Sequence, residues 1–217
     1  WHQFFFSGES ALGKQGYALL HRLDYRLNNL GNLLLIHRFY SHDYWSWHAF
    51  AFGESSTPQN ENGWYLAAEV TPRAHWRLFG SIDLFSHPWW KYRISKPSQG
   101  VDGIMQVQWS PRAPLQCTLN YRYKRKERDI TGTSGQDIRP LHHHRTRLRM
   151  DYTSALWQSQ TTLDYNHLHQ TNMKASQGWS VSQRLSLKPK RWPLQLTLQG
   201  SYFSTDDYDS RIYTYEK

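Results

Sequence analysis

Polar and apolar residues alternate with a period of two along most of this chain. In the segment 115–124, Leu, Cys, Leu, Tyr and Tyr at the odd positions alternate with polar residues at every even position. The segments 157–166 and 194–203 repeat the pattern. Because successive side chains of a β-strand point to opposite faces, each segment is predicted to be a strand with one apolar and one polar face.

Weaker alternation elsewhere predicts ten strands and a partial eleventh. No long segment places apolar residues at the three-and-four spacing of an amphipathic helix, so the fold class is predicted to be all-β. The predicted strands cover 15–26, 32–41, 63–71, 75–85, 101–110, 115–126, 144–153, 156–168, 177–187 and 194–204, and the partial strand covers 211–215.

The predicted connections alternate between short and long. The short ones contain Asn, Gly and Pro, which favour turns through tolerance of positive φ or a preset φ, and they lie at 27–31, 72–74, 111–114, near 154–155, and at 188–193. The long ones are rich in Ser, Gly, His, Asn and charge, and they lie at 42–62, 86–100, 127–143, 169–176 and 205–210.

Two architectures share such alternation, the soluble β-sandwich and the transmembrane β-barrel. The predicted strands exceed the roughly 5–6 residues of an ordinary strand, as tilted strands that cross a bilayer do. Short turns at one end and long loops at the other are typical of outer-membrane barrels. Aromatic residues also gather near predicted strand ends, as interfacial girdles require, at Trp64, Trp76, Trp109, Tyr123, Tyr152, Trp157, Tyr165, Trp179, Trp192 and Tyr202.

The sequence therefore predicts a transmembrane antiparallel up-and-down β-barrel with short periplasmic turns and long extracellular loops. Composition excludes other classes. The longest aliphatic run, 33–36, is far shorter than the roughly 20 residues of a membrane-spanning helix. An aromatic content of 16% excludes a disordered basic chain, although the formal net charge is +9. A single cysteine, Cys117, excludes an intrachain disulfide framework.

The 217 residues are expected to form one β-barrel segment of about ten or eleven strands in a longer chain. Trp1 is not an initiator Met, and no signal-peptide pattern follows it. The first short turn follows the strand at 15–26, which places both ends of the strand series on the long-loop side. Residues 1–14 are expected to be an extracellular loop or the end of a preceding strand.

Several motifs resemble the C-terminal barrel of large Bacteroidota envelope proteins that carry helix-hairpin-helix repeats before the barrel. They are RFYSHDY at 38–44, AFAFGE at 49–54, QNENGWY at 59–65, DLFSHPWWKY at 83–92 and PSQG at 97–100. The resemblance implies a Gram-negative outer membrane and a link to the passage of DNA or other macromolecules. That link belongs to the repeats, none of which lies in these residues. The resemblance implies no catalytic residues.

Basic residues form two sets of candidates. The first opens a predicted extracellular loop at Lys124, Arg125, Lys126 and Arg128, and it either binds phosphates of lipopolysaccharide or DNA or is a solvated strand extension. The second is predicted to face a polar lumen and comprises Arg77, Arg122, Arg145, Arg147, Arg149 and Arg184. These arginines either favour anions or pair with lumenal Asp and Glu.

Trp89 and Trp90, within the cation-rich loop 86–93, are a further extracellular candidate. They are a stacking platform for sugars or bases, or they belong to an aromatic girdle or pack over the lumen.

Catalytic and metal sites are not predicted. Alternation sends His143 to the face opposite His142 and His144, and no carboxylate or Cys is fixed beside them. Ser41, His42 and Asp43 are contiguous, so in an extended chain they do not form a triad. We therefore expect no catalytic residues, metal or cofactor, and a chain that is not an enzyme.

The expected function is that of a porin-like outer-membrane barrel, acting in transport or as the anchor of an envelope complex. Expected partners are outer-membrane lipid and lipopolysaccharide, other envelope proteins and, through the resemblance, nucleic acid. Two alternatives stay open: a soluble or surface β-sheet module that binds glycan or nucleic acid, and a hydrolase at the barrel rim that uses Ser41 and His42.

Overall fold

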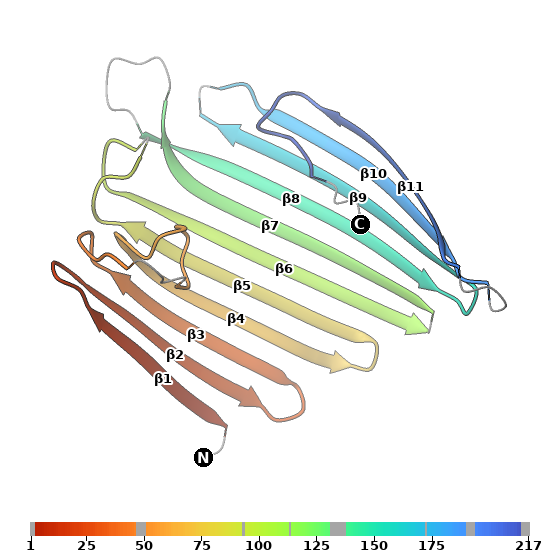
Figure 1. Cartoon of the computed structure of the whole chain (residues 1–217), viewed down its shortest axis with the longest axis horizontal. Helices are drawn as coiled ribbons and strands as arrows, with labels where there is room; N and C mark the ends of the chain where they lie inside the picture. Colours follow the sequence, from red (N-terminus) through yellow and green to blue (C-terminus); the bar gives the residue numbers. More distant parts are fainter. Residues whose placement is uncertain are drawn as a thin grey trace. The chain divides into compact units, whose positions relative to one another are not determined.

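The computed structural model of the chain describes residues 3–46, 51–92, 94–112, 114–130, 138–171, 173–189 and 194–213. In these residues, eleven strands form one antiparallel sheet whose order follows the chain, each strand beside the next (Figure 1). The all-β, up-and-down prediction is confirmed. The strands are β1 (Phe4–Leu12), β2 (Tyr17–Leu27), β3 (Gly31–Tyr40), β4 (Glu61–Arg73), β5 (Trp76–His87), β6 (Ser98–Arg112), β7 (Leu115–Asp129), β8 (Ile138–Thr153), β9 (Trp157–Gln170), β10 (Ser176–Leu187) and β11 (Leu196–Thr205).

Short connections join β2 to β3, β4 to β5 and β8 to β9, at places where the sequence predicts them, and a further one joins β1 to β2. In the β2–β3 turn Asn28 has φ 49°, and in the β4–β5 turn His75 has φ 77°. Asn tolerates this left-handed conformation and was predicted to form a turn. His75 is the second residue of the two-residue β4–β5 connection, the position at which a type II turn has positive φ. Within the described residues, no helix is long and apolar enough to cross a membrane.

Strands reach further toward the long connections than the sequence predicts. β6 begins at 98, β7 continues to 129 and β8 begins at 138, so the predicted long connection 127–143 shortens to 130–137. Lys124, Arg125 and Lys126 therefore lie in β7, as in the predicted strand 115–126, and β7 continues past Arg128, so the set is a strand extension rather than part of a loop. Both faces of these strand ends carry polar side chains, so backbone pairing continues where the apolar alternation has stopped.

The first and last segments also differ from the prediction. Residues Phe4–Leu12 form a full strand, paired with β2 from Phe4↔Tyr25 to Leu12↔Tyr17. The predicted strand 211–215 is not found: 211–213 have no strand conformation, and 214–215 lie outside the described residues. Instead, the side-chain amide of Asn166 on β9 donates a hydrogen bond to the backbone carbonyl of Arg211 at 3.1 Å. This carbonyl is therefore paired with a side chain.

The chain divides into two compact units. The first comprises 1–70, 79–103 and 124–142, and the second comprises 71–78, 104–123 and 143–217. In the first unit Ala18, Tyr40 and Tyr44 form a small buried apolar cluster against which Ala51 packs. The Tyr40 hydroxyl donates to the Phe52 carbonyl at 2.8 Å, which fixes part of the β3–β4 connection to this cluster.

In the second unit one face of the sheet exposes apolar side chains. Val181 lies opposite Leu163 on β9 and Tyr202 on β11, and all three are exposed. Aromatic pairs lie near strand ends, including Tyr152 and Trp157, whose rings stack at 4.7 Å. The predicted girdle residue Trp192 lies outside the described residues. A soluble sandwich would cover such a face, whereas a barrel in a membrane turns it to lipid.

Candidate functional sites on the polar face

The polar face of the second unit forms a groove of about 570 Å³. Apart from Gln183 and Tyr213, its walls come from alternate positions of β6 to β11, opposite in phase to the exposed apolar residues. Of the six arginines predicted to face the lumen, Arg147, Arg149 and Arg184 belong to this grouping. The lining includes Gln106, Gln108, Gln116, Thr118, Asn120, Arg147, Arg149, Gln160, Thr162, Asp164, Ser182, Arg184 and Gln199.

The arginines of this groove are held by acceptors on the neighbouring strands. Arg147 Nε lies 2.5 Å from Asp164 Oδ1, and Arg149 Nε lies 2.7 Å from Asp151 Oδ2. Arg184 donates through Nε and NH2 to Gln199 Oε1, at 2.9 and 2.6 Å. Of the two alternatives for the lumen arginines, pairing with carboxylates is found at Arg147 and Arg149. Because both side chains are half exposed, such pairs contribute little stability, about 0–1 kcal/mol each.

The other three predicted lumen arginines lie outside the set that lines this groove. Arg77 is exposed near the start of β5, and Arg122 is half-buried in β7. Arg145 donates from Nε to His143 Nε2 at 2.9 Å, on the same face of β8.

The histidine run at 142–144 splits between two faces, as the alternation predicts. While His143 contacts Arg145, His144 Nδ1 lies 2.8 Å from the Tyr121 hydroxyl, which belongs to the apolar face. Among the residues that the structure describes, no group of three or more His, Cys, Asp or Glu could hold a metal ion.

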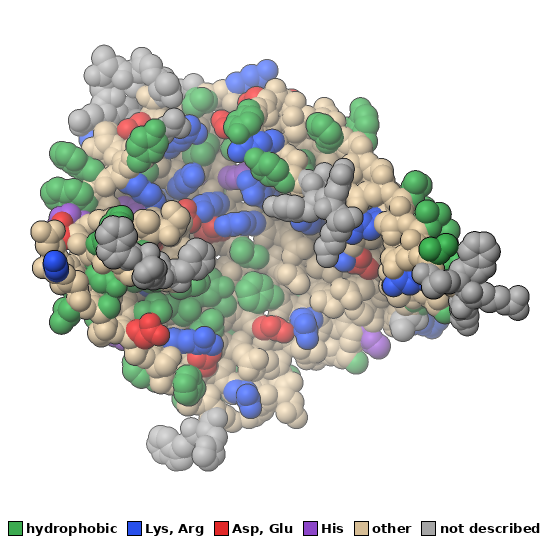
Figure 2. Space-filling view, in the orientation of Figure 1, with side chains coloured by type: hydrophobic (Ala, Val, Ile, Leu, Met, Phe, Trp, Pro, Cys, Tyr) green, Lys and Arg blue, Asp and Glu red, His purple; other side chains and the backbone are tan. Residues whose placement is uncertain are grey.

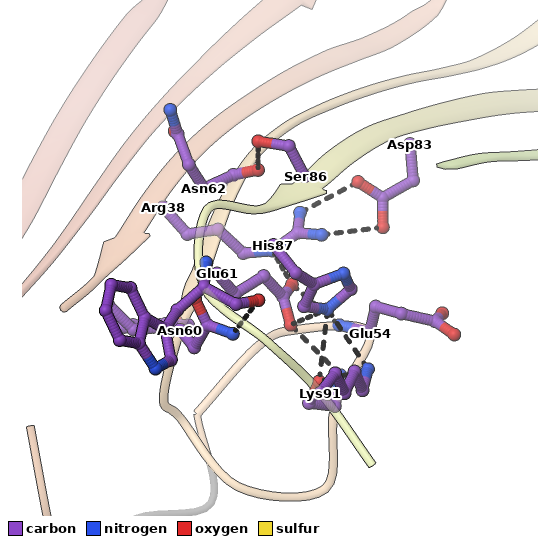
Figure 3. A network of polar contacts seen from close by, with 12 residues as sticks. Arg38, Glu54, Asn60, Glu61, Asn62, Asp83, Ser86, His87 and Lys91 are labelled. Carbon is purple, nitrogen blue, oxygen red and sulfur yellow. Dashed lines mark hydrogen bonds and ion pairs between the residues drawn. The ribbon is translucent and has the colours of Figure 1, made fainter. Parts of the chain in front are cut away.

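The first unit contains a buried ionic cluster on its polar face, formed by Arg38, Glu61 and Asp83 (Figure 3). Arg38 is 0% exposed and Glu61 is 1% exposed. Arg38 donates from Nε to Glu61 Oε1 at 2.5 Å, and from NH1 and NH2 to the two Asp83 oxygens at 2.8 and 3.1 Å. The guanidinium of Arg38 is thus bracketed by carboxylates from β4 and β5, which compensates its burial.

Glu61 also anchors the 51–60 segment, the part of the β3–β4 connection described before β4. Its carboxylate accepts the backbone N–H groups of Glu54 and Ser55 at 2.8 and 3.0 Å. Lys124 of β7 lies 2.7 Å from Glu54 Oε2 and 3.3 Å from Asp102 Oδ2 of β6. The 51–60 segment is therefore tied to strands far along the chain, from β4 to β7.

Lys91 and His87 extend this cluster toward the β5–β6 connection. Lys91 Nζ donates to Ser55 Oγ at 2.8 Å and lies 3.1 Å from His87 Nε2. Because the ammonium is the donor here, Nε2 of His87 is the acceptor and its ring proton is on Nδ1. Burial lowers the pKa of Lys91, and the nearby carboxylates of Glu54 and Glu61 oppose this shift.

Ser41, His42 and Asp43 do not form a relay in this structure. Ser41 Oγ accepts the Tyr17 backbone N–H at 2.9 Å, and His42 Nε2 lies 2.9 Å from Asp43 Oδ1. The His42 ring stacks on Trp89, with centroids 4.9 Å apart. The contiguous triplet thus serves local structure here.

The ionic cluster was missed by the sequence reasoning. Arg38, Glu54, Glu61 and Asp83 were noted only within motifs or as a polar face, because nothing local to each strand shows that they meet. The signal that could have found them is a lone Arg in the otherwise apolar and aromatic strand segment 33–40, since such a charge requires a partner. Ala49, Phe50 and Arg93, also noted in the sequence, lie outside the described residues.

The chain is similar to known proteins at the level of solved structures. No family profile matches the chain, and no curated protein is similar in sequence. Two solved structures of OmpT, an outer membrane protein of Vibrio cholerae, are similar. The loop L8 deletion mutant is 10% identical, with 95% of this chain and 93% of that chain covered and a TM-score of 0.45. The in-vitro folded form is 9% identical, with 93% and 85% covered and a TM-score of 0.44.

The described strands define the class of fold, an all-β, antiparallel up-and-down sheet. The prediction that the chain is not an enzyme is corrected, because one fold can host many functions, and these depend on particular sites. The barrel fold therefore gives no ground for excluding catalysis.

Proposed function

We propose that this chain forms part of the wall of an outer-membrane β-barrel and that its polar face lines a water-filled passage for hydrophilic solutes. The observation that carries the proposal is the separation of the two faces in the second unit. Gln, Asn, Thr, Ser and Arg side chains line a groove on one face, while Leu163, Val181 and Tyr202 are exposed on the other. A membrane barrel with a hydrated lumen requires this arrangement, in which polar side chains face inward and apolar side chains face outward to lipid.

The charges of the groove support a weak preference for anions. Arg147, Arg149 and Arg184 lie in or beside it together with two carboxylates, Asp151 and Asp164. Pairing removes much of the positive potential, so the excess is small and selectivity is modest. On the face shown in Figure 2, Lys and Arg side chains are likewise interspersed with Asp and Glu.

The exposed apolar face supports a location in the outer membrane, with lipid and lipopolysaccharide as its surroundings. A soluble glycan or nucleic-acid module would instead leave this large apolar surface in water, which favours aggregation. Kinship with Bacteroidota envelope proteins is a separate proposal that rests on the motifs at 38–44 and 83–92. Association with other envelope proteins and with DNA would follow from that kinship.

The proposal is tested on the full-length protein refolded into detergent and inserted into planar bilayers. We expect a heat-modifiable band on gels, discrete conductance steps and a reversal potential that indicates a weak anion preference. Replacing Arg147 and Arg149 with Gln should shift this preference toward cations. A heat-modifiable protein that inserts without conducting would contradict the passage.

A further inference from the structure

Three aromatic rings form a stack beside the ionic cluster of the first unit. Trp89 and Trp90 stack with centroids 5.7 Å apart and planes at 25°, and the His42 ring stacks on Trp89 at 4.9 Å and 26°. Both indoles are exposed, Trp89 by 53% and Trp90 by 67%. The rings thus present flat apolar surface to their surroundings.

Asn60 fixes the backbone that carries these two indoles. Its side-chain oxygen accepts a hydrogen bond from the backbone N–H of Trp89 at 2.7 Å. Its side-chain NH2 group donates to the backbone carbonyls of Trp89 and Trp90 at 2.8 and 3.3 Å. Asn60 itself has φ 52°, a left-handed conformation that Asn tolerates better than most residues. The platform is therefore held in place before any ligand arrives, which reduces the entropic cost of binding.

The indoles line a pocket of about 470 Å³ whose other walls are polar. Ser55, Thr57 and Gln59 of the 51–60 segment contribute hydroxyl and amide groups, and Lys91 and His87 lie at the β5 side. His87, only 4% exposed, follows Asp83 at an even spacing along β5 and so belongs to the polar face. The rings consequently face a hydrogen-bonding pocket, whereas girdle residues face lipid.

The charges around this pocket do not favour an anionic ligand. Arg38, Lys91 and Lys124 are set against Glu54, Glu61, Asp83 and Asp102, and the contacts described above join most of them in pairs. The charge of Lys126 also acts on Lys91, so the basic and acidic groups balance and phosphate or sulfate groups would meet a near-neutral site. The pocket instead offers aromatic faces together with neutral donors and acceptors.

We propose that this pocket binds a neutral oligosaccharide. A sugar ring has an apolar face that stacks on an indole and hydroxyls at its edge that exchange hydrogen bonds with Ser, Thr, Gln and Lys side chains. Trp90, the more exposed indole, provides the stacking surface, and Asn60 is a positioning residue that holds it. This pocket shares no lining residue with the groove of the second unit, and its test does not depend on conductance.

The test uses the full-length protein in detergent micelles and titrates it calorimetrically with maltohexaose, cellohexaose and chitohexaose, and with dextran sulfate as the anionic counterpart. At least one neutral oligosaccharide should bind, with an affinity that does not fall when salt is raised. Trp90→Ala should weaken this binding roughly tenfold or more, the size expected when one stacking contact is lost. Asn60→Ala should weaken it while leaving the heat-modifiable gel shift unchanged.

Trp179→Ala is the matched control, because Trp179 is an exposed indole on the apolar face of β10 and should not affect saccharide affinity. The inference is overturned if no neutral oligosaccharide binds, if binding survives Trp90→Ala, or if dextran sulfate binds instead in a salt-sensitive way. It is also overturned if Trp90→Ala impairs only membrane insertion, because the indole would then be an interfacial anchor. A protein that conducts ions but binds no saccharide contradicts this inference alone.

Discussion

The guanidinium of Arg38 lies against the backbone of Gly63, its register partner on β4, so closely that a Cβ at residue 63 would be 2.5 Å from Arg38 Cζ. The Arg38 atoms in this contact belong to a guanidinium that is held by Glu61 and Asp83. The Arg38 side chain therefore cannot move away from a Cβ added at residue 63. Gly63 is required here because a buried ion cluster occupies the space above it.

Gly63→Ala should displace Arg38 and break at least one of its ion pairs. Uncompensated buried charge costs about 3–5 kcal/mol, so we expect a loss of this order in the free energy of unfolding, measured by urea titration in detergent. Gly200→Ala is the control, since a Cβ there meets no atom within 4 Å. Equal stability of the two variants would contradict the described position of Arg38.

Lys124→Gln should loosen the 51–60 segment without unfolding the sheet. Glu54 would lose its charged partner at 2.7 Å, while Glu61 would keep its hold on the Glu54 and Ser55 amides. We expect a loss of about 1–3 kcal/mol and faster proteolytic cleavage within 51–60. Arg125→Gln, at the next position and therefore on the opposite face of β7, is the control; a cleavage rate equal to that of the Lys124 variant would show that the contact does not restrain the segment.

Adjacent residues of β7 should respond oppositely to the introduction of charge. Leu119→Arg places a cation on the exposed apolar face and should cost about 2–4 kcal/mol near the bilayer midplane. Asn120→Arg places it in the polar groove and should be tolerated. The free energy of unfolding from lipid vesicles measures both, and a harmless Leu119→Arg would mean that this face does not contact lipid.

The turn after β11 should loosen in acid. Asp207 accepts hydrogen bonds from the Ser176 hydroxyl at 2.5 Å and from the backbone N–H groups of Asp209 and Ser210 at 2.9 and 3.2 Å. The bond from Ser176 is the main cause that lowers the pKa of Asp207 below its ordinary value of 3.8. The stabilisation is therefore complete above pH 3.8 and is lost as the pH falls through the lower, folded-state pKa.

The Ser210 amide shift, followed by NMR during acidification, should report this titration. Asp207→Asn should abolish it. Asp209→Asn should preserve it, because Asp209 takes part through its backbone. Titration that persists in the Asp207 variant would assign the effect to another group.

Periodicity predicted the part of the fold in which one face is apolar and the other polar. The grouping of Gln116, Arg149 and Thr162 in one groove follows directly from their positions in alternating segments. β1 was not predicted as a strand because its Phe4, Phe5 and Phe6 interrupt the alternation. Its pairing with β2 supplies the backbone hydrogen bonds that its sequence pattern does not signal.

The ionic cluster and the aromatic pocket were beyond the reach of periodicity. Each depends on where a long connection folds back: Glu54 meets Lys124 across 70 residues of sequence, and Asn60 meets Trp89 across 29. The position of such a connection depends on contacts between residues far apart in the sequence, such as the close approach of Arg38 to Gly63. The sequence shows which residues are present but not which distant residues they contact.

The central claim is that one face of the sheet contacts lipid while the alternate face lies in water. Bimane attached to Cys at position 163 or 162, in a Cys117→Ser background, tests it most directly, since Leu163 is on the apolar face and Thr162 lines the groove. In vesicles, the label at 163 should be quenched by doxyl-labelled lipid and the label at 162 by aqueous iodide. Quenching of both labels by iodide, with neither quenched by lipid, would contradict the account.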